Sequence, residues 1–353
     1  MDLDILTISA GNGWMKQEER FSGNIAGKEQ KNYTLLHKGE LSYNHGNSKL
    51  AKYGAVFSLQ NFEEALVPRV YHSFKMLSGS AKFIEYYFAT KLPDRELGKL
   101  ISSGARMDGL LNIKYDDFMG IKLTIPSEME QHKISTFFSK LDNTITLQQR
   151  KLNSLQKLKK GLLQKMFPKK GENIPEIRFP EFSDAWKQRK FGEFVERKSD
   201  SALSSTSIPS VEYENVESET GILKKDIYVK TEFKKGVLFS DKDVLYGKLR
   251  PYLHNWLAPS FTGVAVGDWW VLSPKNCSKD FLYRLLQTLT FDEIANQTSG
   301  TKMPRADWNL VSSTAFYIPS SIEEQAKIGS LFNRIDSTIT LQQRWLFYTH
   351  KQS

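Results

Sequence analysis

The most constraining feature of this 353-residue chain is a segment that occurs twice. Residues 124–150 read TIPSEMEQHKISTFFSKLDNTITLQQR, and residues 317–344 read YIPSSIEEQAKIGSLFNRIDSTITLQQR. From Gln131 and Gln325 onward the register is constant, 194 residues apart (325 − 131), and 12 of the 20 aligned positions are identical. This spacing is far longer than a solenoid period, so the chain contains a duplicated unit, and each copy of the unit ends in one copy of the segment.

Both copies of the segment predict a long amphipathic helix. Each opens with Ile-Pro-Ser, in which the proline restricts the residue before it and the serine can cap the first turn. The apolar positions then alternate in steps of four and three, which is the pattern of a coiled-coil seam. The seam residues are Ile134, Phe138, Leu141, Ile145, Gln148, Leu152 and Leu155 in the first copy, and Ile328, Phe332, Ile335, Ile339, Gln342 and Leu346 in the second. The first helix is expected to span residues 127–166 and to end at a basic, proline-containing run.

The seam has two interpretations. Each helix could pack along its own domain, or the two helices could pair as a coiled coil. The narrow stripe favours pairing, because a globular surface usually requires a wider apolar face. In a paired arrangement the polar seam residues Gln148 and Gln342 would set the register.

The remaining sequence predicts two globular domains of mixed helix and strand. Strand-like patterns occur at residues 3–9, 33–44 and 54–59 in the first part and at 211–216, 226–230, 243–249 and 269–273 in the second, with helical patterns at 81–92 and 279–297. We therefore expect an α/β (α+β) chain with two domains that contain mixed sheets. The expected boundaries are 1–123 for the first domain, 124–167 for the first helix, 168–185 for a linker, 186–316 for the second domain and 317–353 for the second helix.

Composition narrows the class of protein. A formal net charge of +9 indicates an anionic partner, although basicity alone is a weak signal. The single cysteine, Cys277, excludes an internal disulfide and a cysteine-based zinc cluster, and it fits a reducing compartment. The start of the chain lacks the pattern of a signal peptide, and no apolar run approaches the length of a membrane span. A cytoplasmic protein is expected.

Candidate DNA-contacting residues lie in the loops of both domains. Arginine can pair bidentately with guanine, asparagine with adenine, lysine can neutralise phosphate, and glycine permits close approach of the backbone. The candidates are Tyr43, Asn44, Asn47, Lys49, Ser103, Gly104 and Arg106 in the first domain, and Tyr246, Lys248, Arg250, Tyr252, Ser299, Gly300, Lys302 and Arg305 in the second. The alternative for each residue is an ordinary solvated loop.

No catalytic motif is complete. Residues 23–29 resemble a phosphate loop, but they are one residue short and end in Glu29 rather than Ser or Thr. The six histidines lack metal-ligand spacing, and the tetrapeptide typical of amino-methyltransferases is missing. We expect a non-catalytic protein with no metal site and no cofactor of its own.

The order and duplication of these motifs resemble the specificity (S) subunits of type I restriction–modification enzymes over nearly the whole chain. The resemblance is carried by residues 125–127, the runs that end at Gln148-Gln149-Arg150, the bridge IPEIRFPEF at 174–182 with Trp186, and residues 245–252. It implies two target-recognition domains that each read half of a split DNA site, and two conserved helices that pair antiparallel and set the gap. It also implies docking of modification subunits, which methylate adenine with S-adenosylmethionine, and of restriction subunits, which use ATP and Mg²⁺.

The chain departs from the family pattern at both ends. The first domain has no counterpart of residues 186–209, and the second helix ends nine residues after Arg344, so the chain is expected to be shortened. If so, Leu155, Leu162 and Met166 could lack a partner and drive self-association. The main alternative function is a truncated assembly or regulatory factor that binds modification subunits without productive DNA reading. A catalytic nucleic-acid enzyme is a third and weaker alternative.

Overall fold

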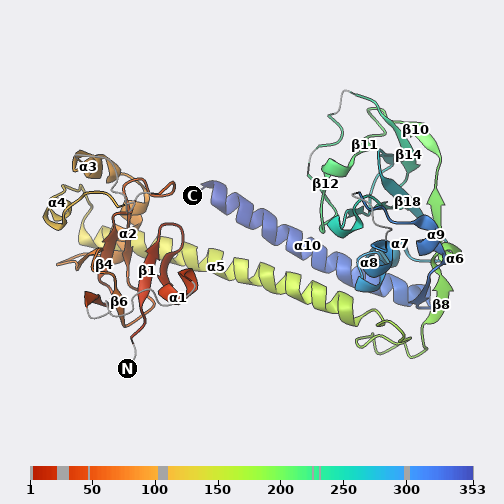
Figure 1. Ribbon diagram of the computed structural model, residues 1–353, viewed down its shortest axis with the longest axis horizontal. Coiled ribbons are helices and arrows are strands. Elements are labelled where there is room, and N and C mark those ends of the chain that lie inside the picture. The colour runs from red at the N-terminus through yellow and green to blue at the C-terminus, as the bar shows by residue number, and fades with distance from the viewer. Residues whose placement is uncertain are drawn as a thin grey trace. The chain divides into compact units, whose positions relative to one another are not determined.

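The computed structural model describes residues 3–21, 32–46, 48–101, 110–224, 226–229, 232–297 and 303–352. The chain divides into two compact units, Met1–Thr146 (unit 1) and Leu147–Ser353 (unit 2). The division falls inside the long helix α5 (Glu128–Lys165), which begins and ends within one residue of the predicted limits. Figure 1 shows that each unit combines small sheets with helices, which confirms the predicted fold class of mixed helix and sheet.

Unit 1 is built on short antiparallel strands that form the sheets β1–β2, β3–β6 and β5–β4–β7. The strands are β1 (Leu6–Ser9), β2 (Gly13–Lys16), β3 (Thr34–His37), β4 (Leu41–Asn44), β5 (Ala55–Ser58), β6 (Glu64–Val67) and β7 (His72–Phe74). The pattern at 33–44, predicted as one strand, forms both β3 and β4 because the chain turns at Gly39, whose φ is +86°. On β4, Leu41 and Tyr43 point to the same face and pack in the core with Phe83 and Phe118.

The helices of unit 1 cover this core and attach it to α5. They are α1 (Gln17–Arg20), α2 (Ala81–Ala89), α3 (Asp94–Lys99), α4 (Tyr115–Met119) and the first part of α5. The side chain of Ser80 caps α2 by accepting a hydrogen bond from Phe83 N at 3.2 Å. Gln131 of α5 accepts from Ser80 N at 3.2 Å through Oε1 and donates to Pro126 O at 2.9 Å through Nε2. This glutamine therefore fastens the start of α2 to the start of α5.

Unit 2 contains two four-stranded sheets, β10-β14-β17-β11 and β16-β15-β18-β9, and the pairs β19-β8 and β12-β13. The strands are β8 (Lys187–Lys190), β9 (Val195–Lys198), β10 (Ser201–Leu203), β11 (Ser210–Val211), β12 (Val216–Glu217), β13 (Ile222–Leu223), β14 (Lys235–Phe239), β15 (Val244–Gly247), β16 (Trp256–Leu257), β17 (Gly263–Ala265), β18 (Trp269–Pro274) and β19 (Ala315–Ile318). The helices are α6 (Phe191–Phe194), α7 (Lys279–Leu285), α8 (Leu289–Ala295), α9 (Trp308–Ser313) and α10 (Ile322–Gln352), with 3₁₀ turns η2 (Tyr213–Asn215) and η3 (Pro251–Leu253).

Three predicted elements of unit 2 differ from the structure. The helix expected over 279–297 is two helices, because Thr288 ends the first stretch and caps α8 by accepting from Phe291 N at 3.3 Å. The strand expected over 211–216 is interrupted by η2. Residues 226–229, the described part of the strand expected over 226–230, contain no strand.

The attachment of unit 2 to its helix repeats that of unit 1. Gln325 of α10 accepts from Ser278 N at 2.8 Å through Oε1 and donates to Pro319 O at 2.8 Å through Nε2. Gln325 aligns with Gln131 in the repeat, and Ser278 precedes α7 as Ser80 precedes α2. Helix α7 lies close against α10 at Gly329, where a Cβ would collide with Asp280. The duplication therefore includes the joint between each domain and its helix.

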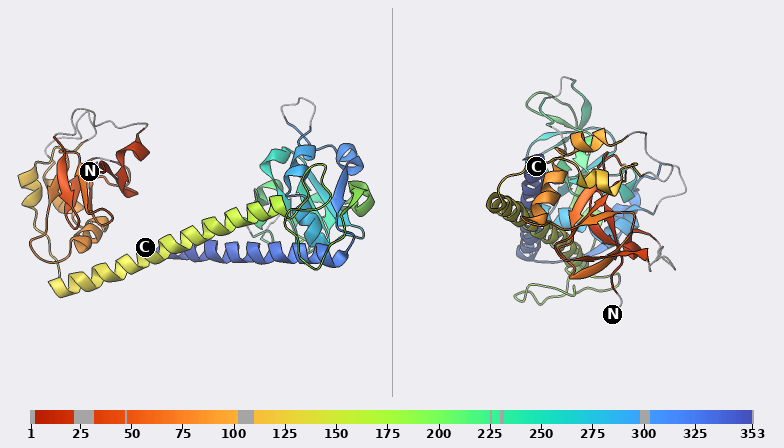
Figure 2. Two further views of the ribbon diagram at one scale, coloured as in Figure 1. Left: turned by 90° about the horizontal axis from the view of Figure 1, so that it is seen from below. Right: turned by 90° about the vertical axis from the view of Figure 1, so that its left-hand side faces the viewer.

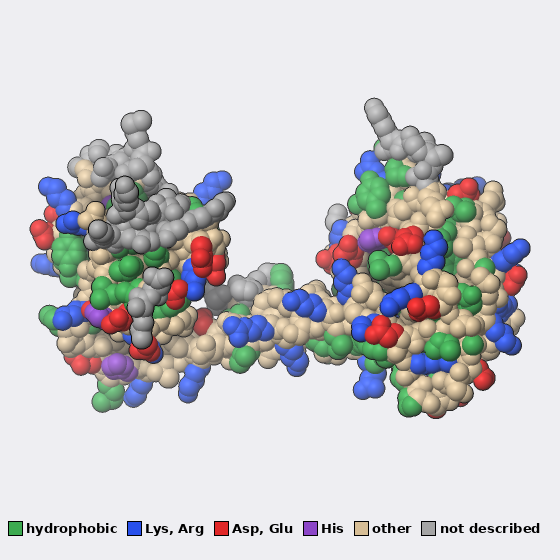
Figure 3. All heavy atoms as spheres, turned by 60° about the horizontal axis from the view of Figure 1, so that its bottom comes forward, with side chains coloured by type: hydrophobic (Ala, Val, Ile, Leu, Met, Phe, Trp, Pro, Cys, Tyr) green, Lys and Arg blue, Asp and Glu red, His purple; other side chains and the backbone are tan. Residues whose placement is uncertain are grey.

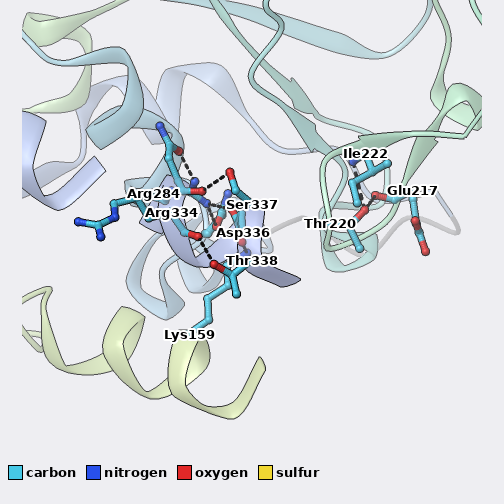
Figure 4. Close-up of polar contacts among 11 residues, drawn as sticks. Lys159, Glu217, Thr220, Ile222, Arg284, Arg334, Asp336, Ser337 and Thr338 are labelled. Atoms are coloured by element: carbon cyan, nitrogen blue, oxygen red, sulfur yellow. Dashed lines mark hydrogen bonds and ion pairs between the residues drawn. The ribbon is translucent and has the colours of Figure 1, made fainter. Parts of the chain in front are cut away.

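Within unit 2, the second part of α5 runs antiparallel to α10 (Figures 1 and 2). Lys159 Nζ lies 2.7 Å from Asp336 Oδ1, and Figure 4 shows this lysine extending from α5 toward Asp336. Further along the chain, Arg178 donates to both carboxylate oxygens of Glu324, at 2.7 and 2.9 Å, near the start of α10. The later residue, Arg178, therefore contacts an earlier position on α10 than Lys159 does, as expected for an antiparallel pair.

The seam residues fit both interpretations, since some pack on their own domain and others lie between the two paired helices. Ile134 packs against the core of unit 1, and the ring of Phe138 lies 5.4 Å from that of Tyr86 on α2. On α10 the ring of Phe332 lies 5.6 Å from the Arg284 guanidinium of α7, so each helix begins by packing on its own domain. The buried members in unit 2 are Leu152, Ile328, Phe332, Ile335, Ile339 and Leu346, while Leu141, Ile145 and Leu155 are half-buried.

The remaining seam predictions have mixed outcomes. Oε1 of both Gln148 and Gln342 is enclosed, with no hydrogen-bond partner among the described residues. Met166 is buried in unit 2 and Leu162 is half-buried, so the idea of an uncovered seam at the end of α5 is wrong.

Over the described ranges, none of the helices is both long enough and apolar enough to span a bilayer.

Candidate nucleic-acid interface

The candidate residues of unit 2 that the structure describes meet where β15 ends and β18 begins. Three segments are joined there by backbone hydrogen bonds: Lys248 N donates to Asp268 O at 2.9 Å, Ala306 N to Lys248 O at 2.8 Å, and Arg250 N to Pro304 O at 2.7 Å. Leu249 and Arg305 form an isolated antiparallel bridge between two of the segments. We call residues 247–250, 267–269 and 304–306 the unit 2 junction.

The junction presents two cations around one carboxylate. Arg305 donates from Nε to Asp268 Oδ1 at 3.3 Å and from Nη2 to Oδ2 at 3.2 Å, and Lys248 Nζ lies 3.6 Å from Oδ1. The side chains are 53% exposed for Arg305, 31% for Lys248 and 27% for Asp268, so all three face solvent in part. The hydrogen bonds that Arg305 donates to Asp268, and then the charge of Asp268, raise the pKa of Arg305, which keeps the guanidinium protonated.

The loop that follows the junction carries backbone strain. Arg250 and His254, on either side of η3, have φ values of +49° and +53°, a left-handed conformation that is costly for residues other than glycine. Arg250 is half-buried, and its Nε is enclosed without a hydrogen-bond partner in the described structure. Tyr252, inside η3, is 52% exposed. Strain of this kind clusters at ligand-binding loops, which fits the predicted site.

Two predicted contacts are corrected by the structure. Tyr43 and Tyr246 are buried, with exposures of 0% and 2%, and therefore cannot contact a duplex without unfolding the core. Tyr43 stacks on Phe118 with ring centroids 4.3 Å apart and donates to Tyr53 O at 2.7 Å. Burial raises the pKa of both tyrosines, which keeps the hydroxyls protonated. Both residues lie on strands that are buried on both faces.

Unit 1 has a matching junction with different side chains. Gly46 and Leu110 form the antiparallel bridge that corresponds to Leu249 and Arg305, and Leu111 N donates to His45 O at 2.8 Å. His45 thus occupies the place of Lys248. Its ring nitrogens lie 2.7 Å from Leu111 O and 2.9 Å from Val70 O.

The place of Asp268 in unit 1 is taken by Val70. This follows from the strand register, since Tyr43 pairs with His72 while Tyr246 pairs with Trp270. His72 stacks on His45 with ring centroids 4.8 Å apart, and its Nε2 lies 2.8 Å from Ile113 O. The bridge and the backbone hydrogen bond beside it therefore recur in both units, whereas Lys248, Asp268 and Arg305 of unit 2 are replaced by His45, Val70 and Leu110.

The other predicted contacts of unit 1 lie at the edge of this junction. Asn44 is half-buried, and its amide is engaged in the loop: Nδ2 donates to Ile8 O at 3.3 Å, and Oδ1 accepts from Gly46 N at 3.1 Å. Lys49 is exposed. Several predicted contacts lie outside the described residues, namely Asn47, Ser103, Gly104, Arg106, Ser299, Gly300 and Lys302.

The sequence alone missed the residues that support the junction. Asp268 precedes β18, and only the register between β15 and β18 brings it beside Lys248. Tyr213 donates to Leu249 O at 2.7 Å and packs its ring 4.8 Å from Trp269, and a Cβ at Gly247 would collide with its hydroxyl. His45 and His72 are 27 residues apart in the sequence, and this spacing matches no motif. A strand-pairing signal could have found each of these residues, whereas motif spacing could not.

Among the residues that the structure describes, no group of three or more His, Cys, Asp or Glu side chains could hold a metal ion. Burial raises the pKa of Cys277 to about 12, so that its thiol stays protonated. Figure 3 shows cationic and anionic side chains interspersed over the visible face of unit 2. On that face, the positive charge does not form one continuous surface.

The comparisons with known proteins fit this duplicated architecture. Residues 3–157 and 183–346 each match the type I restriction modification DNA specificity domain. A type I restriction enzyme MjaVIII specificity subunit from Methanocaldococcus jannaschii is 23% identical over 279 residues, which are 73% of this chain and 64% of that protein. The match thus spans less than two thirds of that relative's length.

Solved structures of similar fold are also specificity subunits. A type I restriction-modification system S subunit from M. genitalium superposes with a TM-score of 0.51 at 16% identity, over 89% of this chain and 80% of that one. The HsdS subunit from Thermoanaerobacter tengcongensis gives a TM-score of 0.47 at 12% identity, over 88% and 76%. The two family matches cover most of the chain, and each contains one globular domain and one copy of the repeated segment. The chain therefore belongs to the family of type I restriction–modification DNA specificity domains.

Proposed function

We propose that this chain is the DNA specificity subunit of a type I restriction–modification complex and reads a bipartite target, one half-site per unit. The helices α5 and α10 would set the gap and dock the modification subunits, and restriction subunits would join that complex. S-adenosylmethionine, ATP and Mg²⁺ would be bound by those partner subunits. This chain would carry out no chemistry itself and would act in the cytoplasm.

The observation that carries the proposal is the pair of matched junctions. An antiparallel bridge and the backbone hydrogen bond beside it occur in both units, yet Lys248, Asp268 and Arg305 of unit 2 correspond to His45, Val70 and Leu110 of unit 1. A protein that reads two different half-sites requires a constant scaffold with different side chains at its reading edge. Guanidinium and ammonium groups on such an edge suit guanine and phosphate respectively.

A methylation map tests the proposal directly. Genomic DNA from cells that express this chain with its neighbouring modification subunit should contain methyladenine in a split motif. That motif should be missing from cells that lack the chain. Unchanged methylation in spite of a stable complex with the modification subunit would contradict DNA reading and favour an assembly or regulatory factor. Methyltransferase or nuclease activity of the purified chain alone would contradict a non-catalytic role.

Three substitutions separate base contacts from phosphate contacts in unit 2. Arg305→Ala should relax the choice of bases in one half-site by about 1–3 kcal/mol, because a bidentate contact with guanine is lost. Arg250→Ala should do the same if Arg250 turns toward the groove. Lys248→Ala should weaken binding to all sequences evenly and reduce the salt dependence by about one unit. Competition binding on specific and random duplexes distinguishes these outcomes, and equal losses on both duplexes for all three variants would contradict base reading.

A further inference from the structure

The most distinctive feature of the unit 2 junction is that its acid, rather than its cations, is held in place. Asp268 lies between Gly267, whose φ is +96°, and the first residue of β18. Its carbonyl accepts from Lys248 N at 2.9 Å, and the next residue, Trp269, pairs with Gly247 on β15. Its carboxylate is therefore positioned by the sheet, whereas Arg305 and Lys248 reach it through long side chains.

The contact between Asp268 and Arg305 has the geometry of an orienting pair. Both oxygens of the carboxylate are engaged by the guanidinium, through Nε at 3.3 Å and Nη2 at 3.2 Å. A two-point contact fixes the plane of the guanidinium as well as its location, and a single contact cannot do so. Arg305 is still 53% exposed. The remaining donor edge of the guanidinium is therefore available to another planar acceptor.

The same carboxylate also limits where the cations can go. Without Asp268, the flexible side chains of Arg305 and Lys248 would be drawn to the nearest phosphates, which attract cations whatever the base sequence. With Asp268 beside them, part of their charge is balanced and the guanidinium loses rotational freedom before DNA arrives. An aspartate that weakens general attraction for DNA while orienting one arginine favours selectivity over affinity.

We propose that Asp268 is the positioning residue that directs Arg305 to the guanine of a G·C pair in the half-site of unit 2. The inference rests on the proposed function. In the major groove, guanine presents the acceptors O6 and N7 to the arginine. The paired cytosine presents its N4 amino group, from which a carboxylate can accept a hydrogen bond. Asp268 and Arg305 together match both bases of one pair. Unit 1, with Val70 and Leu110 at these positions, reads no G·C pair in this manner.

The test uses the full chain in complex with the modification subunit encoded beside it, and Asp268→Asn as the variant. Binding is measured on duplexes that carry the methylated motif, on versions with each base pair replaced in turn, and on random-sequence duplexes of equal length. Discrimination at one G·C pair of a single half-site should fall about ten-fold, because the arginine is no longer oriented. Affinity for random duplexes should rise, and its dependence on salt should steepen by about one unit as a freed cation meets phosphate.

A matched control removes the same charge elsewhere on unit 2. Asp200 is exposed in the turn between β9 and β10, and Asp200→Asn should raise random binding slightly without changing discrimination at any base pair. The double variant Asp268→Asn with Arg305→Ala should discriminate no worse at that pair than Arg305→Ala alone, because Asp268 acts through Arg305. A defect of folding alone would lower binding to specific and random duplexes together.

The outcomes separate this inference from the proposed function. If the complex of the unsubstituted chain prefers no sequence, the proposed function fails, and the role of Asp268 fails with it. If it prefers a motif and Asp268→Asn leaves discrimination unchanged at every G·C pair, only the role of Asp268 is overturned. An equal loss in Asp200→Asn would also overturn it, because charge rather than position would then be responsible.

Discussion

The two units share the hydrogen bonds that join each domain to its helix, but they differ in the groups that bind the aspartate further along that helix. Gln131 and Gln325 make equivalent pairs of hydrogen bonds, one to the residue before the domain helix and one to a proline carbonyl. Eleven residues later the repeat has an aspartate in both copies. Asp142 accepts only a tyrosine hydroxyl and lies exposed, with Tyr86 Oη at 2.6 Å, whereas Asp336 accepts from Arg284 and Lys159, both at 2.7 Å.

This difference teaches that an identical residue in a repeat need not have an identical energetic role. The residue that faces the aspartate decides its role, and that residue lies in the divergent part of each domain. In unit 2 the Arg284 side chain is 1% exposed, and among the described residues Asp336 is the carboxylate that pairs with its charge. In unit 1 the corresponding pair is Tyr86 and Asp142, of which the tyrosine is neutral and the aspartate is solvated. The comparison therefore predicts unequal consequences from equal substitutions.

The largest difference between the units should follow Asp336→Asn. It leaves Arg284 buried without a counter-charge and Lys159 without its partner, and removal of one member of a buried ion pair costs about 3–5 kcal/mol. Burial lowers the pKa of Lys159, while Asp336 opposes that shift, so the lysine depends on the same carboxylate. Hydrogen exchange of the α7 and α10 amides should report the loss.

Asp142→Asn is the matched control for this prediction. Its aspartate accepts one hydroxyl at an exposed site, and the variant should cost unit 1 about 1 kcal/mol or less, seen in the α2 amides. Equal destabilisation of the two units would contradict the assignment of Asp336 as the counter-charge of a buried arginine.

The repeat made much of the scaffold predictable. Helices α5 and α10 were predicted to within a few residues because period and capping residues are local signals. The partner of each seam residue was not predictable in this way. Whether Ile134 meets another helix or its own domain depends on the position of α2, which is a tertiary property. For the same reason α7 and α8 were merged, since their sequences are apolar on either side of Thr288.

The second prediction concerns the closest approach of a domain to its helix. Gly329→Ala should destabilise unit 2 by about 1–3 kcal/mol, because the new Cβ meets the Asp280 side chain and backbone on α7. Alanine has a higher helix propensity than glycine, worth about 1 kcal/mol, but this gain offsets only part of the cost. Unfolding in denaturant, followed by exchange of the α7 amides, measures the change.

Gly161→Ala on α5 separates crowding from propensity. Its Cβ would have no neighbour within 4 Å, so it should stabilise the chain by about 0.5–1 kcal/mol. The residue of unit 1 that corresponds to Gly329 is Ser135, which accepts from Ser80 Oγ at 3.0 Å; Ser135→Ala should cost about 1 kcal/mol with no shift of α2. Destabilisation by Gly161→Ala as large as that by Gly329→Ala would refute the crowding explanation.

The candidate site was less predictable than the scaffold. The loops at 246–252 and 299–305 were chosen for their cations and glycine, and the structure, which describes the second of them from residue 303 onward, does bring Lys248 and Arg305 together. Tyr43 and Tyr246 were chosen for their residue type, but they lie on strands whose two faces are both covered, which is a tertiary property. Asp268 was missed because an acid near a predicted DNA contact carries no motif. Side chains that act through strand pairing become visible only when the register is known.

The smallest effect should come from the aromatic end of the unit 1 junction, and it depends on pH. Burial lowers the pKa of His72, the hydrogen bond to Ile113 O opposes this shift, and the charge of His45 adds to it. The groups that face the imidazole are His45 from the end of β4, Tyr43 of β4, and Tyr115 and Phe118 of α4. A pKa below its unfolded value means that protonation favours the unfolded state.

The stability contributed by His72 is therefore present above pH 6.5 and is lost as the pH falls through the folded-state pKa. Unit 2 provides the internal control, because Trp270 occupies the matching position and does not titrate. Exchange-derived stability should fall more in β4 and β7 than in β15 and β18 when the pH is lowered from 7.5 to 5.5. His72→Gln keeps a donor for Ile113 O and should remove the excess in unit 1. If the excess persists in that variant, a group other than His72 is responsible for the pH response of unit 1, and the assignment to the imidazole is wrong.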